Sequence, residues 1–235
     1  MARRVLVTGH RGAAGLEPEN TLRSFRRACD LGVDRVETDI HLTRDGVPVC
    51  IHDARLDRTT NGSGLVQEQS LDEIRRLDAG RGERIPTLAE ALAEVRGHAV
   101  FKLELKGEGT PAPTVAAIEA AGMSPEEVMV ISFDEALVAE ARSLRAGIPR
   151  GLIFSNPPAD AISRALRLGA RELMVHFESA TPGLVQSAHA AGVALGAWTV
   201  NERADMERIL ALGVDDIGSD RPDILVELLR EKGRG

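Results

Sequence analysis

Three carboxylates in this sequence have a spacing that suits a hard metal ion. Glu37 and Asp39 lie two residues apart in an expected strand, so both side chains point to one face of the sheet. Glu104 stands in the same way in the next expected strand. Ionised carboxylates inside a protein repel one another and are costly to desolvate unless a cation neutralises them. Oxygen ligands of this kind favour Mg²⁺ or Ca²⁺, although an ion-pair network with Lys102 and Lys106 would also account for them.

Two histidines and two cationic side chains stand where neighbouring expected strands end. His10 and Arg11 end the first strand, His52 ends the β-run that follows the second, and Lys106 follows Glu104. An imidazole exchanges protons near neutral pH, and a guanidinium or ammonium group binds phosphate. Each residue alone is weak evidence. Metal-assisted displacement at phosphorus is the chemistry that uses all of these groups together.

These groups need a scaffold that brings several strand ends to one place. A helical pattern, then Leu or Ala before Gly, then a short β-rich run recurs around Gly32, Gly169, Gly192 and Gly213, which is typical of repeated βα units. Counting them gives eight units if residues 47–52 continue the second strand, which predicts a TIM (β/α)8 barrel. A doubly wound sheet is the competing fold, but no GxGxxG motif follows the first strand. The expected strands are Val5–Gly9, Arg35–Leu42, Val47–His52, Val100–Lys106, Val128–Ser132, Gly151–Ser155, Glu172–His176, Val193–Val200 and Asp216–Ser219.

Local signals indicate where several helices begin. Asn20 is expected to cap the first helix, Ser70–Glu73 and Thr87–Glu90 have capping-box spacing, and Thr181–Pro182 gives a cap followed by proline. Residues 54–85 interrupt the rhythm with turn-rich sequence and one short helix. We interpret them as a cap-like insertion after the second strand, within a single domain that spans residues 1–235.

Length and composition limit the classes of protein. The 235 residues are 43% hydrophobic and 28% charged, with a net charge of −7 and only 3% aromatic residues, so a disordered chain or a nucleic-acid binder is not expected. The apolar run at the N-terminus is too short for a signal peptide, and no stretch is apolar enough to span a membrane. We expect a cytoplasmic monomer or small homo-oligomer without a stable membrane association.

Several motifs together resemble the glycerophosphodiester phosphodiesterase family. They stand in the family's order and cover essentially the whole chain, and the combination of HRG, PENT, ExD and HD is highly specific. The matching segments are His10–Gly12, Pro18–Thr21, Glu37–Asp39, His52–Asp53, Leu56–Gly62, Ile85–Leu88, Glu104–Lys106, Trp198–Asn201 and Asp220–Pro222.

The resemblance implies a TIM barrel that hydrolyses glycerophosphodiesters such as glycerophosphocholine and glycerophosphoethanolamine to glycerol 3-phosphate and an alcohol. It implies one divalent cation, Mg²⁺ or Ca²⁺, held by Glu37, Asp39 and Glu104. It also implies acid–base catalysis by the histidines of the HRG and HD motifs. We expect His10 to act as the base and His52 as the acid, although these roles could be exchanged, and the nucleophile could be the glycerol 2-hydroxyl or water.

The same resemblance assigns residues around the substrate. Arg11 and Lys106 match the phosphate-contacting cations of the family, and Trp198 matches an apolar wall near the glycerol group. Glu19 and Asn20 belong to the PENT motif and are expected to support the site from behind, Glu19 by holding His10 or Arg11.

The sequence departs from the family at two places. Only residues 81–84 separate the Asp78–Gly80 turn from the IPTL match, where many members have a longer segment, and this affects the expected alcohol preference. Lys102 shares a strand face with Glu104 and could pair with a metal-site carboxylate. The alternatives are a lysophospholipase D-like phosphodiesterase on the same barrel and a non-catalytic binding barrel; a carboxylate-metal aldolase or isomerase is less favoured.

Overall fold

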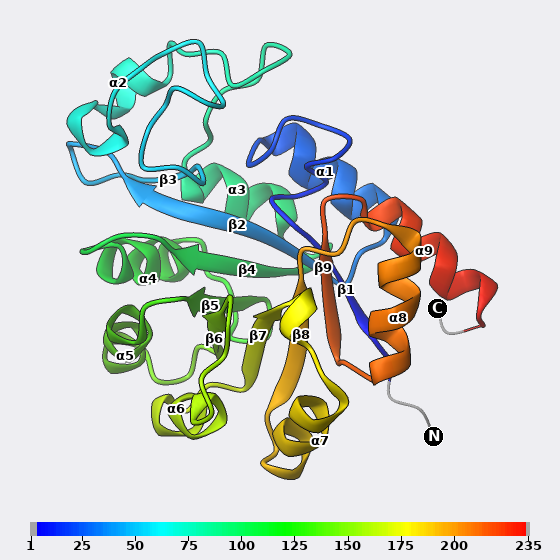
Figure 1. Cartoon of the computed structure of the whole chain (residues 1–235). Helices are drawn as coiled ribbons and strands as arrows, with labels where there is room; N and C mark the ends of the chain where they lie inside the picture. Colours follow the sequence, from blue (N-terminus) through cyan, green and yellow to red (C-terminus); the bar gives the residue numbers. More distant parts are fainter. Residues whose placement is uncertain (1–3, 234–235) are drawn as a thin grey trace.

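Eight parallel strands form a closed ring in the computed structural model, which describes residues 4–233 (Figure 1). β1 pairs with both β9 and β2, and this double pairing closes the barrel. The predicted TIM barrel is thereby confirmed. The ring consists of β1 (Leu6–Gly9), β2 (Arg35–Leu42), β4 (Val100–Leu105), β5 (Val128–Ser132), β6 (Arg150–Phe154), β7 (Glu172–His176), β8 (Ala194–Trp198) and β9 (Asp216–Ser219).

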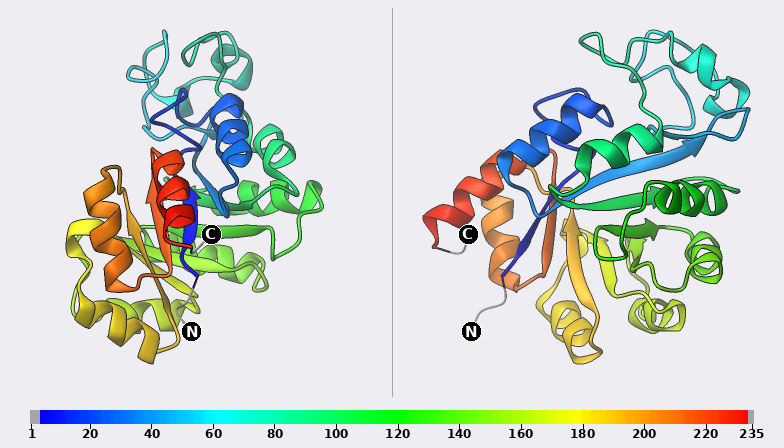
Figure 2. Two further views of the ribbon diagram at one scale, coloured as in Figure 1. Left: turned by 90° about the vertical axis from the view of Figure 1, so that its right-hand side faces the viewer. Right: turned by 180° about the vertical axis from the view of Figure 1, so that it is seen from behind.

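A helix follows each barrel strand and packs on the outside of the ring, so that the first and last helices lie near each other (Figures 1 and 2). The apolar strand residues that face outward form one continuous core with these helices. No helix within residues 4–233 is long and apolar enough to cross a membrane. The outer helices are α1 (Leu22–Leu31), α3 (Leu88–Val95), α4 (Pro111–Ala120), α5 (Glu135–Leu144), α6 (Ala161–Leu168), α7 (Pro182–Ala190), α8 (Arg203–Leu212) and α9 (Pro222–Glu231).

Most of the helix signals in the sequence act as expected. Both capping boxes form, Thr181 caps α7, and Gly32 ends α1 in the left-handed conformation (φ 78°) that glycine adopts without steric cost. The expectation for Asn20 is wrong, because Thr21 is the N-cap of α1 and accepts a hydrogen bond from the Ser24 amide. Asn20 itself has left-handed backbone (φ 55°), whereas an N-cap residue has extended backbone.

An insertion follows β2 and stands on one rim of the barrel, at the top of Figure 1. β3 (Pro48–Cys50) pairs antiparallel with the end of β2, and the chain then forms η1 (Val66–Glu68) and α2 (Leu71–Ile74) before it reaches α3. A small apolar cluster of its own holds this segment together, consisting of Val49, Ile51, Leu56, Val66, Ile74, Ala79 and Ile85.

A buried charge cluster fills the barrel interior near the amino ends of the strands. The ammonium group of Lys102 is fully buried and donates hydrogen bonds to Glu172 Oε1 (2.8 Å) and to Asp216 Oδ2. Arg35 Nη1 binds the same two carboxylates, at 2.6 Å from Glu172 Oε2 and 3.2 Å from Asp216 Oδ2. The expected pairing of Lys102 with a metal-site carboxylate is therefore wrong. Lys102 stands one interior layer below Glu104, where its partners come from β7 and β9.

Candidate functional site

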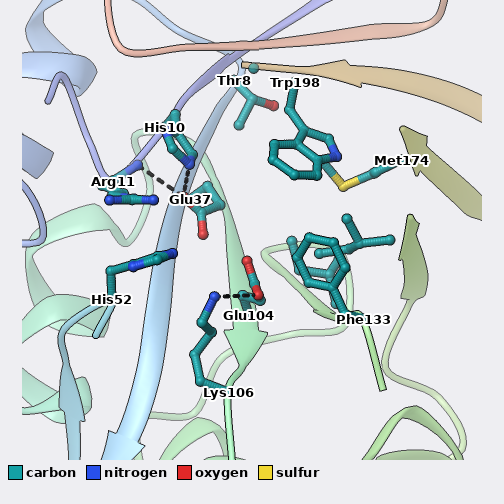
Figure 3. Close-up of a pocket in the computed structure, with 13 residues that line it drawn as sticks. Thr8, His10, Arg11, Glu37, His52, Glu104, Lys106, Phe133, Met174 and Trp198 are labelled. Atoms are coloured by element: carbon teal, nitrogen blue, oxygen red, sulfur yellow. Dashed lines mark hydrogen bonds and ion pairs between the residues drawn. The ribbon is translucent and has the colours of Figure 1, made fainter. Parts of the chain in front are cut away.

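The carboxyl ends of the barrel strands surround one pocket whose two sides differ in chemistry (Figure 3). His10, Arg11 and His52 form one side, with Glu37, Glu104 and Lys106 at its base. Ile131, Phe133, Ile153, Met174 and Trp198 form the other side. Seven of the predicted site residues thus line the pocket, and Glu19, Asn20 and Asp39 lie directly behind them.

The three predicted metal ligands converge at the base of the polar side. Asp39 on β2 is in register with Glu104 on β4, and one oxygen of each carboxylate, Glu37 included, lies within 4.8 Å of the other two. All three residues are at most 8% exposed. Within residues 4–233, neither Glu37 Oε1 nor Asp39 Oδ1 accepts a hydrogen bond, although the Lys106 ammonium group lies 3.4 Å from Asp39 Oδ1. Buried carboxylate oxygens that accept no hydrogen bond fit a hard divalent cation, which prefers oxygen ligands.

Negative charge in this cluster is only partly compensated by protein cations. Lys106 Nζ lies 2.8 Å from Glu104 Oε1 and 3.4 Å from Asp39 Oδ1. Burial and the charge of Asp39 raise the pKa of Glu37 to about 8, and the same two causes raise the pKa of Glu104. Burial opposes the ionisation of Asp39, but Lys106 and Arg11 lower its pKa below the usual range. The protein cations thus stabilise Asp39 as an anion, whereas for Glu37, and for Glu104 in spite of its contact with Lys106, they do not offset burial and the neighbouring negative charge.

Each predicted catalytic histidine is oriented by an aspartate. His10 Nδ1 donates to Asp220 Oδ1 (2.6 Å), and His52 Nδ1 donates to Asp53 Oδ1 (2.6 Å). Because an ionised carboxylate only accepts hydrogen bonds, Nδ1 carries the proton and Nε2 of each ring is free for proton transfer. His10 Nε2 lies 4.0 Å from Glu37 Oε2.

The two imidazoles differ in how readily they bind a proton. Burial opposes the protonation of His10, but the hydrogen bond to Asp220 and the charge of Glu37 raise its pKa above the usual value. Burial lowers the pKa of His52 in spite of Asp39 and Asp53. Groups whose environments shift their pKa values in opposite directions are suited to opposite roles in proton transfer.

The loop after β1 places the guanidinium group of Arg11 against the carboxylate cluster. Arg11 has left-handed backbone (φ 50°), and its amide donates to Glu37 Oε2 (2.9 Å). Its guanidinium group donates to Glu19 Oε1 (2.9 Å) and has Nε 3.5 Å from Asp39 Oδ2. Of the two partners expected for Glu19, the structure shows Arg11.

Asn20 contacts a predicted metal ligand from behind. Its amide donates to Asp39 Oδ2 (2.9 Å) and its carbonyl oxygen accepts from Thr38 Oγ1 (2.6 Å), with only 3% of the residue exposed. These hydrogen bonds fix the direction of the Asp39 carboxylate. Support of this kind tunes the affinity of a metal ligand.

Aromatic rings form the opposite wall of the pocket. The Trp198 ring contacts Phe133 edge-to-face at 5.4 Å between centroids, and Phe133 is 42% exposed. Trp198 Nε1 is buried, and no acceptor within residues 4–233 reaches it. Phe133 was not predicted from the sequence, although its position directly after β5 was an available signal. Asp53 and Asp220 lay within quoted motifs, but nothing local assigned them to the histidines.

Comparisons with known proteins agree in one family. The sequence profile of the Glycerophosphoryl diester phosphodiesterase family matches residues 10–224. A glycerophosphodiester phosphodiesterase of Caldanaerobacter subterraneus subsp. tengcongensis is 37% identical over 98% of this chain and 100% of its own length. A glycerophosphodiester phosphodiesterase of Bacillus subtilis is 30% identical over 94% of this chain and 85% of its own.

Solved structures lead to the same family. A phosphodiesterase of Oleispira antarctica, solved in complex with the product sn-glycerol-3-phosphate, superimposes with a TM-score of 0.89 at 33% identity, covering 96% of both chains. A glycerophosphodiester phosphodiesterase of Agrobacterium tumefaciens str. C58 superimposes with a TM-score of 0.84 at 29% identity, covering 95% of this chain and 99% of the other.

Proposed function

Because the chain belongs to the glycerophosphoryl diester phosphodiesterase family and is thus a phosphoric diester hydrolase, we propose that it cleaves glycerophosphocholine and glycerophosphoethanolamine with the help of a divalent cation. The products would be glycerol 3-phosphate and the free alcohol. The observation that carries this proposal is the convergence of two histidines, two cations and three buried carboxylates on one pocket. The product named for the Oleispira antarctica relative supports the same substrate class.

Glu37, Asp39 and Glu104 would hold the cation, Mg²⁺ or Ca²⁺. When bound, such an ion supplies positive charge that polarises a phosphoryl oxygen. The all-oxygen ligand set and the two buried oxygens that accept no hydrogen bond within residues 4–233 support this assignment. Asn20 would keep Asp39 in place through its 2.9 Å hydrogen bond.

Arg11 and Lys106 would bind the phosphate of the substrate. They lie on opposite sides of the carboxylate cluster, and both line the pocket (Figure 3). The planar guanidinium group can donate two parallel hydrogen bonds to phosphate, and the ammonium group adds a point charge. Positive charge fixed at this place also stabilises the charge that develops on the phosphoryl oxygens during displacement.

His52 and His10 would move the protons of the reaction. Both rings are held through Nδ1 by an aspartate and keep Nε2 free, so one would take a proton from the nucleophile and the other would protonate the departing alkoxide. Trp198 and Phe133 would contact the carbon atoms of the substrate on the other side of the pocket.

The test is an assay of alcohol and glycerol 3-phosphate release. Glycerophosphocholine, glycerophosphoethanolamine, glycerophosphoglycerol and lysophosphatidylcholine are each incubated with the protein in Mg²⁺, Ca²⁺ or EDTA. We expect EDTA-sensitive release from the first three. Turnover of lysophosphatidylcholine alone would favour the lysophospholipase D-like alternative, and absence of metal-dependent release from every substrate would refute the proposal.

Variants test the histidines directly. His10→Ala and His52→Ala should each lower kcat/KM by about 10²–10⁴, the usual contribution of general acid–base catalysis. His98→Ala is the matched control, because His98 is exposed and follows α3, away from the strand ends that form the pocket. Near-normal activity of both catalytic variants in the presence of metal would contradict these roles.

A further inference from the structure

The LDRTTNG motif, residues 56–62, lies in the insertion and has no role in the chemistry described so far. One of its residues, Arg58, reaches back to the barrel and binds two carboxylates at once. Its Nη1 and Nη2 donate to Glu19 Oε2 and Oε1, both at 2.8 Å. Its Nε and Nη2 donate to Asp53 Oδ2 (2.7 Å) and Oδ1 (3.1 Å). All the carboxylate oxygens of Glu19 and Asp53 therefore accept hydrogen bonds from one guanidinium group.

Each of these two carboxylates also holds a group of the pocket. Glu19 Oε1 accepts from Arg11 Nη1 at 2.9 Å, and Asp53 Oδ1 accepts from His52 Nδ1 at 2.6 Å. A continuous chain of side-chain hydrogen bonds thus links Arg11, Glu19, Arg58, Asp53 and His52. The charges of its first four members alternate, and Arg58 stands at its centre.

We propose that Arg58 is a positioning residue that fixes His52 and Arg11 relative to each other through Asp53 and Glu19. This inference rests on the proposed function, in which His52 transfers a proton and Arg11 binds phosphate. Asp53 and Glu19 are partly open to solvent, with side chains 30% and 19% exposed. Without Arg58, each keeps a single partner in the pocket and can rotate with it.

The pKa shifts of Asp53 and Glu19 agree with these hydrogen bonds. Hydrogen bonds from Arg58 are the main cause that holds the pKa of Asp53 well below its usual range. Burial opposes the ionisation of Glu19, but Arg58 and Arg11 lower its pKa as well. The planar fork of arginine can serve two carboxylates simultaneously, whereas the single ammonium group of lysine cannot reproduce that geometry.

A second arginine of the insertion also attaches the insertion to the barrel, but it does not contact the carboxylates that hold the site residues. Arg81 Nη1 donates to Glu17 Oε2 (2.6 Å) and to the Leu16 carbonyl oxygen (3.2 Å). It therefore attaches the same insertion to the same loop between β1 and α1, and neither Glu19 nor Asp53 is its partner in these contacts. Arg81→Ala is consequently the matched control for Arg58→Ala.

The experiment compares Arg58→Ala, Arg58→Lys and Arg81→Ala with the wild type on glycerophosphocholine. Arg58→Ala should lower kcat/KM by about 10–100-fold, the usual effect of removing a partner behind a site residue, with kcat reduced through His52 and KM raised through Arg11. Arg58→Lys should recover part of the loss. Arg81→Ala should have a kcat/KM within about 2-fold of the wild type. Both alanine variants should unfold at thermal midpoints within about 4 °C of the wild type, because exposed ion pairs contribute little stability.

A second readout does not depend on turnover. In protein labelled with ¹⁵N-histidine, the Nδ1-bound proton of His52, assigned by its absence in His52→Gln, reports the hydrogen bond to Asp53. Its resonance should shift or broaden in Arg58→Ala and stay unchanged in Arg81→Ala. Wild-type kinetics and an unchanged resonance in Arg58→Ala, or equal losses in both alanine variants, would overturn the inference. If the wild type cleaves none of the diesters, the proposed function fails, and the His52 resonance still decides the role of Arg58.

Discussion

Lys102→Met provides a sharp test of the charge arrangement inside the barrel. Lys102 and Arg35 face the carboxylates of Glu172 and Asp216, so the cluster contains two cations and two anions. The variant replaces the fully buried ammonium group by an apolar side chain of similar length. Of the two cluster cations, Arg35 alone then remains, and it faces two carboxylates.

The magnitude follows from burial. Removing one partner of a buried ion pair costs about 3–5 kcal/mol, because a charge is left uncompensated in a medium of low polarity. An unfolding entropy of about 2.1 cal/mol/K per residue applied to 235 residues corresponds to about 0.5 kcal/mol/K. The midpoint of thermal unfolding should therefore fall by about 6–10 °C at neutral pH.

The pH dependence has a defined sign. Burial opposes the ionisation of Asp216, but Lys102 and Arg35 hold its pKa well below the usual range. A carboxylate with a lowered folded-state pKa stabilises the protein above its unfolded-state pKa, and that contribution is lost as pH falls through the folded-state value. In Lys102→Met this lowering is reduced. The difference in midpoint between wild type and variant should thus stay nearly constant between pH 7.5 and pH 5 and become smaller as pH falls below about 4, the unfolded-state pKa of aspartate.

Calorimetry of the wild type, Lys102→Met and the double variant Lys102→Met/Asp216→Asn measures these differences. The double variant restores charge balance, with Arg35 facing Glu172, and should recover a large part of the lost stability. Affinity for Mg²⁺ or Ca²⁺ should change little in Lys102→Met, because Lys102 stands below the metal-site carboxylates. A midpoint within 2 °C of the wild type, or a large change in metal affinity, would refute this reasoning.

Two further predictions concern the pocket. Asn20→Gly keeps the left-handed backbone (φ 55°) but removes the hydrogen bond to Asp39, so affinity for Mg²⁺ or Ca²⁺ measured by titration calorimetry should fall about 10–100-fold; unchanged affinity would contradict the supporting role of Asn20. Phe133→Ala removes one of the two rings of the aromatic wall and should raise KM for glycerophosphocholine several-fold with little change in kcat. Leu144→Ala, at an exposed position of α5, is the control and should change neither constant. Equal KM values in both variants would show that Phe133 does not contact the substrate.

Local patterns in the sequence predicted the scaffold well. The strands Arg35–Leu42, Val128–Ser132, Glu172–His176 and Asp216–Ser219 have the expected bounds, and both capping boxes form where Ser/Thr and Glu stand three residues apart. These signals depend on neighbours within a few residues along the chain, so a single sequence contains them. Asn20 is the exception. Its side chain suits a cap, but the turn before α1 gives it left-handed backbone and directs it to Asp39.

Strand alternation alone could not place Lys102. It puts Lys102 and Glu104 on the same face of β4, but residues two apart in a strand are separated by about 6.6 Å along it, which is one interior layer of a barrel. Glu172 and Asp216, the partners of Lys102, are 70 and 114 residues away in sequence. Only the closed ring and its register bring them to the same layer.

The residue types at the strand ends can be read from the sequence, and they indicate the family and the chemistry to expect. Which of these side chains meet depends on the folded barrel. Closure between β1 and β9 brings Asp220 to His10 across 210 residues, and the insertion brings Arg58 to Glu19 and Asp53. Such contacts depend on barrel register and on how loops return to the rim. No local pattern of residues encodes either of these, because both arise from the packing of the whole ring.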